Sequence, residues 1–372
     1  MSLPQIAPKS TAGHAIRVMI VDDAVVVRGL MSRWLSEESG IEVVGTFRNG
    51  REAVDNVLKL KPDIVVLDID MPELDGLSAL PLLLARKSDL VVIMASTLTR
   101  RNAEVSLKAL SLGAIDYVTK PETSREIMFT LSFRHEIVEK IKHLGRRARS
   151  APLHSKGLRG EAIDPRAQAI SLRPFSPVPP RVLAIGSSTG GPQALQVLIR
   201  GLSPVLARLP IVITQHMPPT FTAILAEHLA RAANRPAHEG VHGETIKPGT
   251  LYVAPGGKHM RLERQAESTA IVIGDDAPVH FCKPAVDPLF HSAATAFGPA
   301  LLAVVLTGMG TDGTEGARDI AAGGGSVIAQ DEASSVVWGM PGSAAHSGQC
   351  SAVLPLEEIA SRVVRLVNGD RS

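Results

Sequence analysis

The stretch RVLAIGSSTGGPQAL, residues 181–195, decides how the second half of this 372-residue chain folds. It begins as an apolar run, turns on glycines and resumes at Pro192 with a pattern typical of a helix. This order indicates a strand-turn-helix unit of a parallel sheet. A serine in such a turn is a nucleophile, part of a phosphate-binding loop or a residue of a tight corner.

The composition of the chain indicates a folded protein of two or three domains. Its 39 basic and 37 acidic residues leave a net charge of +2, and aromatic residues make up only 3%. Because neither a basic surface nor many stacking rings are available, we expect no nucleic-acid partner. Nothing in the sequence demands assembly, and we expect a monomer.

The two cysteines and the N-terminal residues indicate the cellular compartment of the protein. Cys282 and Cys350 lie too far apart for a paired-cysteine metal motif, and we expect both as buried small apolar residues in a reducing compartment. Residues up to about His14 lack the apolar core of a signal peptide, and no apolar run is long enough to cross a bilayer. We therefore expect a cytoplasmic protein without membrane insertion.

Hydrophobic periodicity divides the chain into two α/β domains joined by a linker. Residues 15–139 alternate strand-like runs such as IVVLD and VVIMAS with amphipathic stretches, which predicts a parallel sheet covered by helices. Residues 140–180 are basic and then rich in proline, which is typical of a solvated linker. Residues 181–372 resume the alternation. The basic cluster in the linker, which could also bind an acidic surface, consists of Arg146, Arg147 and Arg149.

Acidic residues end two strands of the first domain. Asp22 and Asp23 follow the first strand, Asp68 ends the third, and Lys120 follows the fifth. These strand ends share one sheet edge, and clustered carboxylates with open positions suit Mg²⁺. Helix capping would explain Asp22 or Asp23 singly, but it explains neither Lys120 nor Ser96 at the same edge.

The motifs VDD, LDIDMPELDG, MAS and DYVTKP together resemble the receiver domain of two-component response regulators. The resemblance implies a flavodoxin-like fold and a phosphoryl group accepted by the carboxylate of Asp68. It implies that Asp23, Asp68 and the backbone carbonyl of Asp70 hold Mg²⁺, while Asp22 supports the water shell of the metal.

The same resemblance implies how the phosphoryl group is sensed. Lys120 would pair with the phosphoryl oxygens, Ser96 would donate a hydrogen bond to them, and Tyr117 would change rotamer. Receivers often have threonine where Ser96 stands, and a serine hydroxyl makes the same bond. The donor would be a histidine kinase.

In the second domain, Gly186, Ser188 and Gly190 fit the G-x-S-x-G pattern of a nucleophile between a strand and a helix. Glycine-rich turns also bind phosphates, although GSSTGG lacks the second glycine of the dinucleotide fingerprint. The motif by itself leaves hydrolase and nucleotide binding equally open.

A nucleophilic serine needs a base and an orienting acid. His216 follows the strand-like run IVIT, and Asp312 lies in a glycine-rich loop after another such run, so both belong to the sheet edge that carries Ser188. The chain order Ser, His, Asp differs from that of α/β-hydrolases and disfavours their fold. Rival residues, for which structural roles are preferred, are His259, His291, Asp287, Ser187 and Ser335.

The motifs IGSSTGGPQAL, VITQHMPPTFT, YVAPGGKHM, LTGMGTDG and AQDEASSVVWGMPGSA resemble the methylesterase domain of the protein-glutamate methylesterases, which are chemotaxis response regulators. This implies a doubly wound, mainly parallel sheet, with Ser188 as nucleophile, His216 as general base and acid, and Asp312 orienting the imidazole. The amide of Met309 would be the oxyanion donor, and no cofactor would be needed for ester hydrolysis. The family commonly has alanine where Ser187 stands.

The implied activity is hydrolysis of glutamate γ-methyl esters on chemoreceptors, together with deamidation of receptor glutamines, controlled by phosphorylation. The alternative is a receiver-controlled signalling or nucleotide-binding module without esterase chemistry. A DNA-binding output domain is disfavoured by the neutral charge and the glycine-rich α/β pattern.

Overall fold

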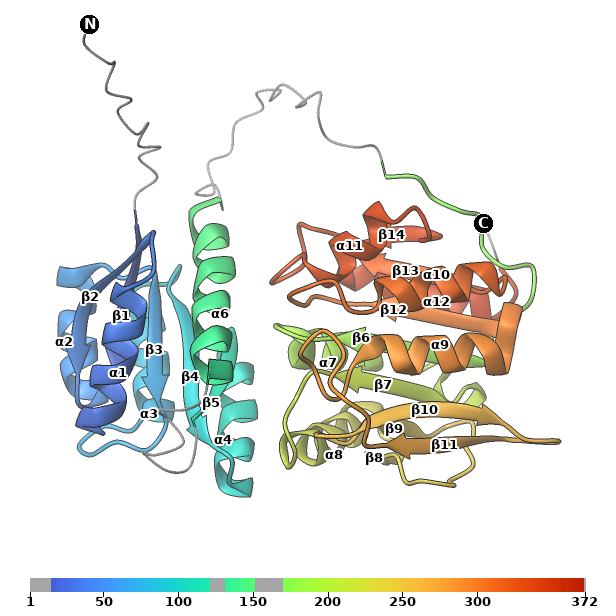
Figure 1. Ribbon diagram of the computed structural model, residues 1–372, viewed down its shortest axis with the longest axis horizontal. Helices are drawn as coiled ribbons and strands as arrows, with labels where there is room; N and C mark the ends of the chain where they lie inside the picture. The colour runs from blue at the N-terminus through green and yellow to red at the C-terminus, as the bar shows by residue number, and fades with distance from the viewer. Residues whose placement is uncertain (1–14, 121–130, 151–169, 371–372) are drawn as a thin grey trace, which may run out of the picture.

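The computed structural model describes residues 15–120, 131–150 and 170–370, which form two α/β units side by side (Figure 1). The basic cluster of the predicted linker and its residues 151–169 lie outside the part whose side chains are described. Residues 170–180, also within that linker, run along the C-terminal unit, where the Ser176 hydroxyl donates to the carbonyl of Pro299 at 2.7 Å. Within the described ranges, no helix combines the length and the apolar character needed to span a membrane.

The N-terminal unit is a five-stranded parallel sheet in the order β2-β1-β3-β4-β5. Every residue of β3, the middle strand, is buried, as expected for a sheet covered on both faces. Its strands are β1 (Ile16–Val21), β2 (Ile41–Phe47), β3 (Ile64–Asp68), β4 (Val91–Thr97) and β5 (Asp116–Lys120). Its helices are α1 (Val25–Ser36), α2 (Gly50–Leu60), α3 (Gly76–Arg86), α4 (Arg100–Ser111) and α6 (Leu131–Ser150).

Short polar side chains begin three of these helices. Asn49, Asp75 and Thr99 precede α2, α3 and α4, and each accepts a hydrogen bond from an amide of the first helical turn. Such caps replace the intrahelical partners that the first amides lack. The helices therefore begin directly after the loops at the carboxyl ends of the strands, which fixes those loops.

The C-terminal unit is a seven-stranded parallel sheet in the order β14-β13-β12-β6-β7-β9-β8, with the hairpin β10-β11 beside it. The chain leaves β6 toward β7 on one side and later returns to β12 on the other, so strand order reverses at β6. Ligands of such sheets bind at the carboxyl ends of the strands beside that reversal. The strands are β6 (Val182–Ser187), β7 (Ile211–Gln215), β8 (Ala237–Glu239), β9 (Leu251–Val253), β10 (His259–Arg264), β11 (Thr269–Gly274), β12 (Leu301–Val305), β13 (Ser326–Gln330) and β14 (Ala352–Leu354).

Helices cover both faces of this second sheet. One apolar cluster packs α7, α8 and α12 on one face, and another packs α9, α10 and α11 on the other. The doubly wound α/β architecture predicted from the sequence is therefore present in both units. The helices are α7 (Gly191–Gly201), α8 (Phe221–Ala233), α9 (Val286–Phe297), α10 (Thr314–Ala322), α11 (Met340–His346) and α12 (Leu356–Val367).

The two units share an interface in which α4, β5 and α6 face α7 and α8 (Figure 1). The ring of Tyr117 stacks on that of Phe221, with centroids 4.7 Å apart and planes 12° from parallel. Nearby, Arg100 forms an ion pair with Glu227 at 2.6 Å. This places the N-terminal unit against the carboxyl edge of the second sheet, where the predicted catalytic residues lie.

Candidate active site

The turn between β6 and α7 holds Ser188 at the carboxyl end of the sheet. Gly190 has a φ of +77°, which glycine adopts without strain, and a Cβ there would lie 2.6 Å from Val336. The amide of Ser188 donates to the carbonyl of Thr307 at 3.1 Å, which ties the turn to the loop after β12. Ser188 therefore lies beside the N-terminus of α7, whose first amides favour negative charge.

The structure distinguishes the two adjacent serines. The hydroxyl of Ser187 is buried and donates to Oε1 of Gln215 at 2.7 Å. The other end of that amide, Nε2, donates to the carbonyl of Ser188 at 2.9 Å. The Ser188 side chain is half-buried and lines a cavity. Ser187 is thus bound within the sheet edge, and Ser188 is the serine that a substrate can reach.

His216 and Asp312 come together although 96 positions separate them in the sequence. His216 follows β7, Asp312 lies in the loop between β12 and α10, and Nε2 of the imidazole lies 2.7 Å from Oδ2 of the carboxylate. Because Nε2 is engaged, Nδ1 is the ring nitrogen left to exchange a proton with a substrate or with Ser188. No hydrogen bond yet joins the Ser188 hydroxyl to this ring among the residues that the structure describes.

The carboxylate of Asp312 is held by the first residues of α9. Its oxygens accept the amides of Val286 at 2.6 Å and Asp287 at 2.9 Å, and α9 has no side-chain cap of its own. Burial raises the pKa of Asp312. The hydrogen bond and charge of His216, together with these two amides, lower the pKa by more than burial raises it, so it falls below the ordinary value. Asp312 is therefore an ionised, fixed partner for the imidazole.

The electrostatic surroundings of His216 favour its protonated form. Burial lowers the pKa of the imidazole, but this is outweighed by Cys282, whose thiol lies within hydrogen-bonding reach, and by Asp312, so that the pKa is raised to about 10. In this arrangement the ring holds its proton near neutral pH. A base must be unprotonated to accept the proton of a serine, so the surroundings of this ring govern activity.

The loop after β12 approaches Ser188 closely enough to form an oxyanion site. A Cβ on Gly308 would lie only 2.9 Å from Cβ of Ser188, so only glycine permits this approach. The next amide, that of Met309, has no hydrogen-bond partner within the described ranges. A free amide beside the nucleophile can stabilise the negative oxygen of a tetrahedral intermediate.

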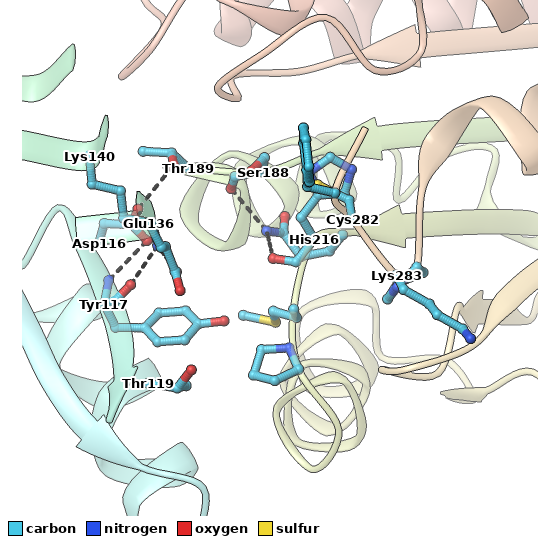
Figure 2. Close-up of a pocket in the computed structure, with 15 residues that line it drawn as sticks. Asp116, Tyr117, Thr119, Glu136, Lys140, Ser188, Thr189, His216, Cys282 and Lys283 are labelled. Atoms are coloured by element: carbon cyan, nitrogen blue, oxygen red, sulfur yellow. Dashed lines mark hydrogen bonds and ion pairs between the residues drawn. The ribbon is translucent and has the colours of Figure 1, made fainter. Parts of the chain in front are cut away.

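A cavity of about 260 Å³ lies over these residues. Ser188, His216 and Cys282 line one side, and side chains of β5 and α6 of the N-terminal unit line the other (Figure 2). The lining residues of the N-terminal unit are Asp116, Tyr117, Thr119, Glu136 and Lys140. A bound protein segment would have to displace that unit.

A buried hydrogen bond joins the N-terminal unit to the residue after Ser188. The Thr189 hydroxyl donates to Oδ2 of Asp116 at 3.0 Å, and the same carboxylate pairs with Lys140 at 3.0 Å (Figure 2). Lys140 also pairs with Glu136 at 3.0 Å and donates to the carbonyl of Tyr117. Movement of β5 or α6 therefore bears directly on the turn that carries Ser188.

The predicted acidic site of the N-terminal unit also forms. Oxygens of Asp22, Asp23 and Asp68 lie within 4.8 Å of one another, and Lys120 Nζ lies 2.6 Å from Asp68 and 3.1 Å from Asp22. Burial raises the pKa of Asp68 to about 7; the charge of Lys120 opposes this and that of Asp22 adds to it. Carboxylates that repel one another in this way fit a divalent cation bound by oxygen.

The other predicted residues of this site lie at the same edge. Ser96 is buried one position beyond the partner of Asp68 on β4, and its hydroxyl donates to the carbonyl of Thr97 at 3.3 Å. The side chain of Asp70 accepts a hydrogen bond from Asn102, which directs it toward α4. Tyr117 lies instead in the interface between the units, where it links β5 to α8.

Comparison with known proteins identifies the family. Residues 183–363 match the family model described as CheB methylesterase, and residues 18–132 match that of the response regulator receiver domain. A Rhodopseudomonas palustris (strain HaA2) protein named protein-glutamate methylesterase/protein-glutamine glutaminase is 58% identical over 380 residues, covering 98% of each chain. The chain belongs to the CheB methylesterase family.

A further relative of this CheB methylesterase chain agrees. A Bradyrhizobium diazoefficiens protein named protein-glutamate methylesterase/protein-glutamine glutaminase of group 2 operon is 56% identical over 392 residues, covering 98% of this chain and 99% of its own. The crystal structure of the Thermotoga maritima CheB methylesterase catalytic domain is 39% identical and covers 51% of this chain and 100% of its own, with a TM-score of 0.49. The family predicted from the sequence motifs is confirmed.

The rival residues of this CheB methylesterase chain have other partners. His259 is buried between the carbonyl of Ala277 and the amide of Ala285, and exposed His291 pairs with Asp319. Asp287 accepts the amide of Gly316, so it caps α10 rather than its own helix. The Ser335 hydroxyl donates to the carbonyl of Asp331.

One expectation for this CheB methylesterase chain is wrong. Cys350 is buried as expected, but Cys282 is half-buried and lines the cavity against His216. The reason is the tight turn before it, which brings residues 279–282 over the site. Sequence reasoning also missed Thr189, Gln215 and Phe281, because no local pattern marks contacts between distant loops.

Proposed function

We propose that this protein is a phosphorylation-activated protein-glutamate methylesterase, which hydrolyses γ-methyl esters of glutamate side chains on methyl-accepting chemoreceptors and deamidates receptor glutamines. The observation that carries this proposal is the 2.7 Å contact between His216 and Asp312 in the cavity that Ser188 lines. Such a constellation is suited to acyl transfer. The relatives bearing the same activity in their names support it.

Hydrolysis proceeds through an acyl-enzyme. Ser188 Oγ attacks the ester carbonyl carbon while Nδ1 of His216 takes the hydroxyl proton, and the amide of Met309 donates to the oxygen that becomes negative. The tetrahedral intermediate collapses as His216 returns the proton to the departing methoxide, releasing methanol. Water then attacks the acyl-enzyme, giving up a proton to His216, and Ser188 leaves with that proton.

Asp312 serves the imidazole throughout this cycle. It fixes the ring through Nε2 and stabilises the imidazolium that forms in both halves of the reaction. Deamidation of a glutamine uses the same steps with ammonia as the leaving group. Since an amide nitrogen leaves only when protonated, the proton held by His216 matters more there.

The N-terminal unit acts as the receiver. Asp68 accepts the phosphoryl group from a histidine kinase, and Lys120 and Ser96 contact the phosphoryl oxygens. A Mg²⁺ ion held by Asp23, Asp68 and the carbonyl of Asp70, with Asp22 supporting its water shell, would neutralise charge on the transferring group. The raised pKa of Asp68 and the closeness of the carboxylates support that site.

Phosphorylation controls access to Ser188. The cavity over the nucleophile is lined on one side by the receiver, and Tyr117 and Asp116 contact Phe221 and Thr189 directly. A phosphoryl group that changes the position of β5 or Tyr117 weakens these contacts and opens the cavity. In this proposal residues 15–139 form the receiver, 140–180 the segment that joins the units, and 181–372 the catalytic domain, in a monomeric cytoplasmic protein. The first part of the joining segment, residues 140–150, continues α6.

The first prediction concerns methanol release. With methylated chemoreceptor fragments, the chain should release methanol, and Mg²⁺ with a small phosphoryl donor should raise the rate at least about tenfold. Asp68→Asn or chelation of Mg²⁺ should remove the stimulation and leave the basal rate. If several receptor fragments yield no methanol and the chain binds a nucleotide saturably, the result would instead favour a nucleotide-binding module without esterase chemistry.

The second prediction concerns Cys282. Because His216 must lose its proton to act, activity is present above the pKa of His216 and lost as the pH falls through it. The thiol raises that pKa, so Cys282→Ser should move the acidic limb of the profile of kcat/KM against pH to lower pH. The phosphorylated chain is the protein to measure, with Cys350→Ala as the matched control. If the acidic limb of the profile does not move, the Cys282 thiol does not set the pKa of His216.

A further inference from the structure

A tight hairpin turn projects from the catalytic unit beside the cavity. The amide of Val279 donates to the carbonyl of Cys282 at 3.1 Å, and the reverse bond measures 2.8 Å. The two residues between them, His280 and Phe281, have φ angles of 50° and 62°. Positive φ at both central positions defines a type I′ turn, which normally takes Asn-Gly or Asp-Gly.

Phe281 is unfavourable at this position on two counts. A bulky residue at positive φ brings its Cβ against its own backbone. Its side chain is also 96% exposed, more than that of any other large apolar residue in the described ranges. A residue held in a sparsely populated backbone conformation costs stability, and such residues cluster at functional sites.

The turn is attached to the catalytic machinery. Cys282, the residue after Phe281, lies against His216, and Phe281 itself lines the same cavity as Ser188. Across the cavity, the ring of Phe281 lies 6.3 Å from that of His135 on α6. The receiver covers so little of Phe281 that this contact does not account for the residue.

Charged side chains near the turn are already paired. Lys258 and Lys283 both contact Asp275 at 2.7 Å, and Arg261 contacts Asp276 at 2.6 Å. A partner approaching this rim therefore meets an exposed aromatic ring among neutralised charges. The favourable contact available to such a partner is apolar.

We propose that Phe281 is the docking anchor for the protein substrate: it inserts into an apolar recess on the methylated receptor, next to the esterified glutamate. This inference rests on the proposed function. The occupant follows from the position, since the target is a side chain on a folded protein and Phe281 projects beside the nucleophile. Aromatic anchors near the centre of an interface carry much of its binding energy.

A docking role and a structural role predict different kinetics. Phe281→Ala should raise the KM for methylated receptor fragments about tenfold or more and leave kcat within about twofold, because the lost contact is made equally in the ground and transition states. Hydrolysis of p-nitrophenyl acetate, which has no protein surface to dock on the turn, should not change. Phe281→Leu should restore most of the affinity. The matched control is Val241→Ala, because Val241 is exposed but does not line the cavity.

Stability supplies a second, independent readout. Phe281→Asn should raise the thermal midpoint, since asparagine tolerates positive φ, while the KM for the receptor rises as in Phe281→Ala. An unchanged KM in both variants would overturn the anchor. Equal losses with receptor and small ester would also overturn it, since the turn would then only position Cys282 and His216.

Binding separates this inference from the proposed function. The affinity of Ser188→Ala for methylated receptor fragments is compared with that of the double variant Ser188→Ala, Phe281→Ala, so no turnover is needed. If the single variant binds and the double variant binds about tenfold more weakly, the anchor stands even if no methanol is released. Equal affinities, or no binding by either protein, would reject it.

Discussion

Replacing Ser188 by alanine should lower methanol release from methylated receptor fragments by about four powers of ten or more, because members of a catalytic triad act as a unit. Alanine removes the hydroxyl oxygen that attacks the ester, and the remaining groups can assist only direct attack by water. The side chain is half-buried, and its hydroxyl makes no hydrogen bond within the described ranges, so folding should be unaffected. Single-turnover release of methanol by the phosphorylated chain measures this loss.

Ser187→Ala is the matched control for this variant. It removes a neighbouring hydroxyl of the same kind, which is bonded to Gln215 and directed away from the cavity. We expect kcat within a fewfold of the parent and a loss of about 1 kcal/mol in the free energy of unfolding from the broken buried hydrogen bond. If Ser187→Ala were the inactive variant and Ser188→Ala the active one, the assignment of the nucleophile would be wrong.

Replacing Asp312 by asparagine should lower kcat by about three to four powers of ten, as expected when a triad acid loses its charge but keeps its shape. Asp312 accepts from Nε2 of His216 and from the amides of Val286 and Asp287. If the asparagine oxygen takes the place of Oδ1, where it accepts from the amides of Asp287 and Gly313, its NH₂ group takes the place of Oδ2 and faces the imidazole and the amide of Val286. Nε2 must then accept, the ring proton moves to Nδ1, and Nδ1 can no longer take the proton of Ser188.

Asp319→Asn controls for a general effect of removing an acid, since Asp319 pairs with exposed His291 outside the cavity. The thermal midpoints of both variants show whether the first turn of α9 survives the loss of its carboxylate cap. A loss of activity below about tenfold in folded Asp312→Asn would exclude Asp312 as the residue that orients the base.

Much of the fold follows from local sequence patterns. Buried runs such as those of β3 and β6 require strands covered on both faces, and Asn49, Asp75 and Thr99 begin helices by hydrogen bonds to amides three residues away. These interactions are short in sequence, so a single chain reveals them. Convergence of Ser188, His216 and Asp312 follows from the rule that parallel strands end at one edge.

The sequence by itself thus determined two α/β units, their strand ends and the candidate residues placed there. Only the tertiary structure decided that Ser187 bonds to Gln215 while Ser188 faces the cavity, that Cys282 contacts His216, and that Thr189 bonds to Asp116, 73 positions away. The physical reason is the range of the interactions. Backbone conformation is set by near neighbours, whereas contacts between side chains on distant loops depend on how whole layers pack, and no local pattern records that packing.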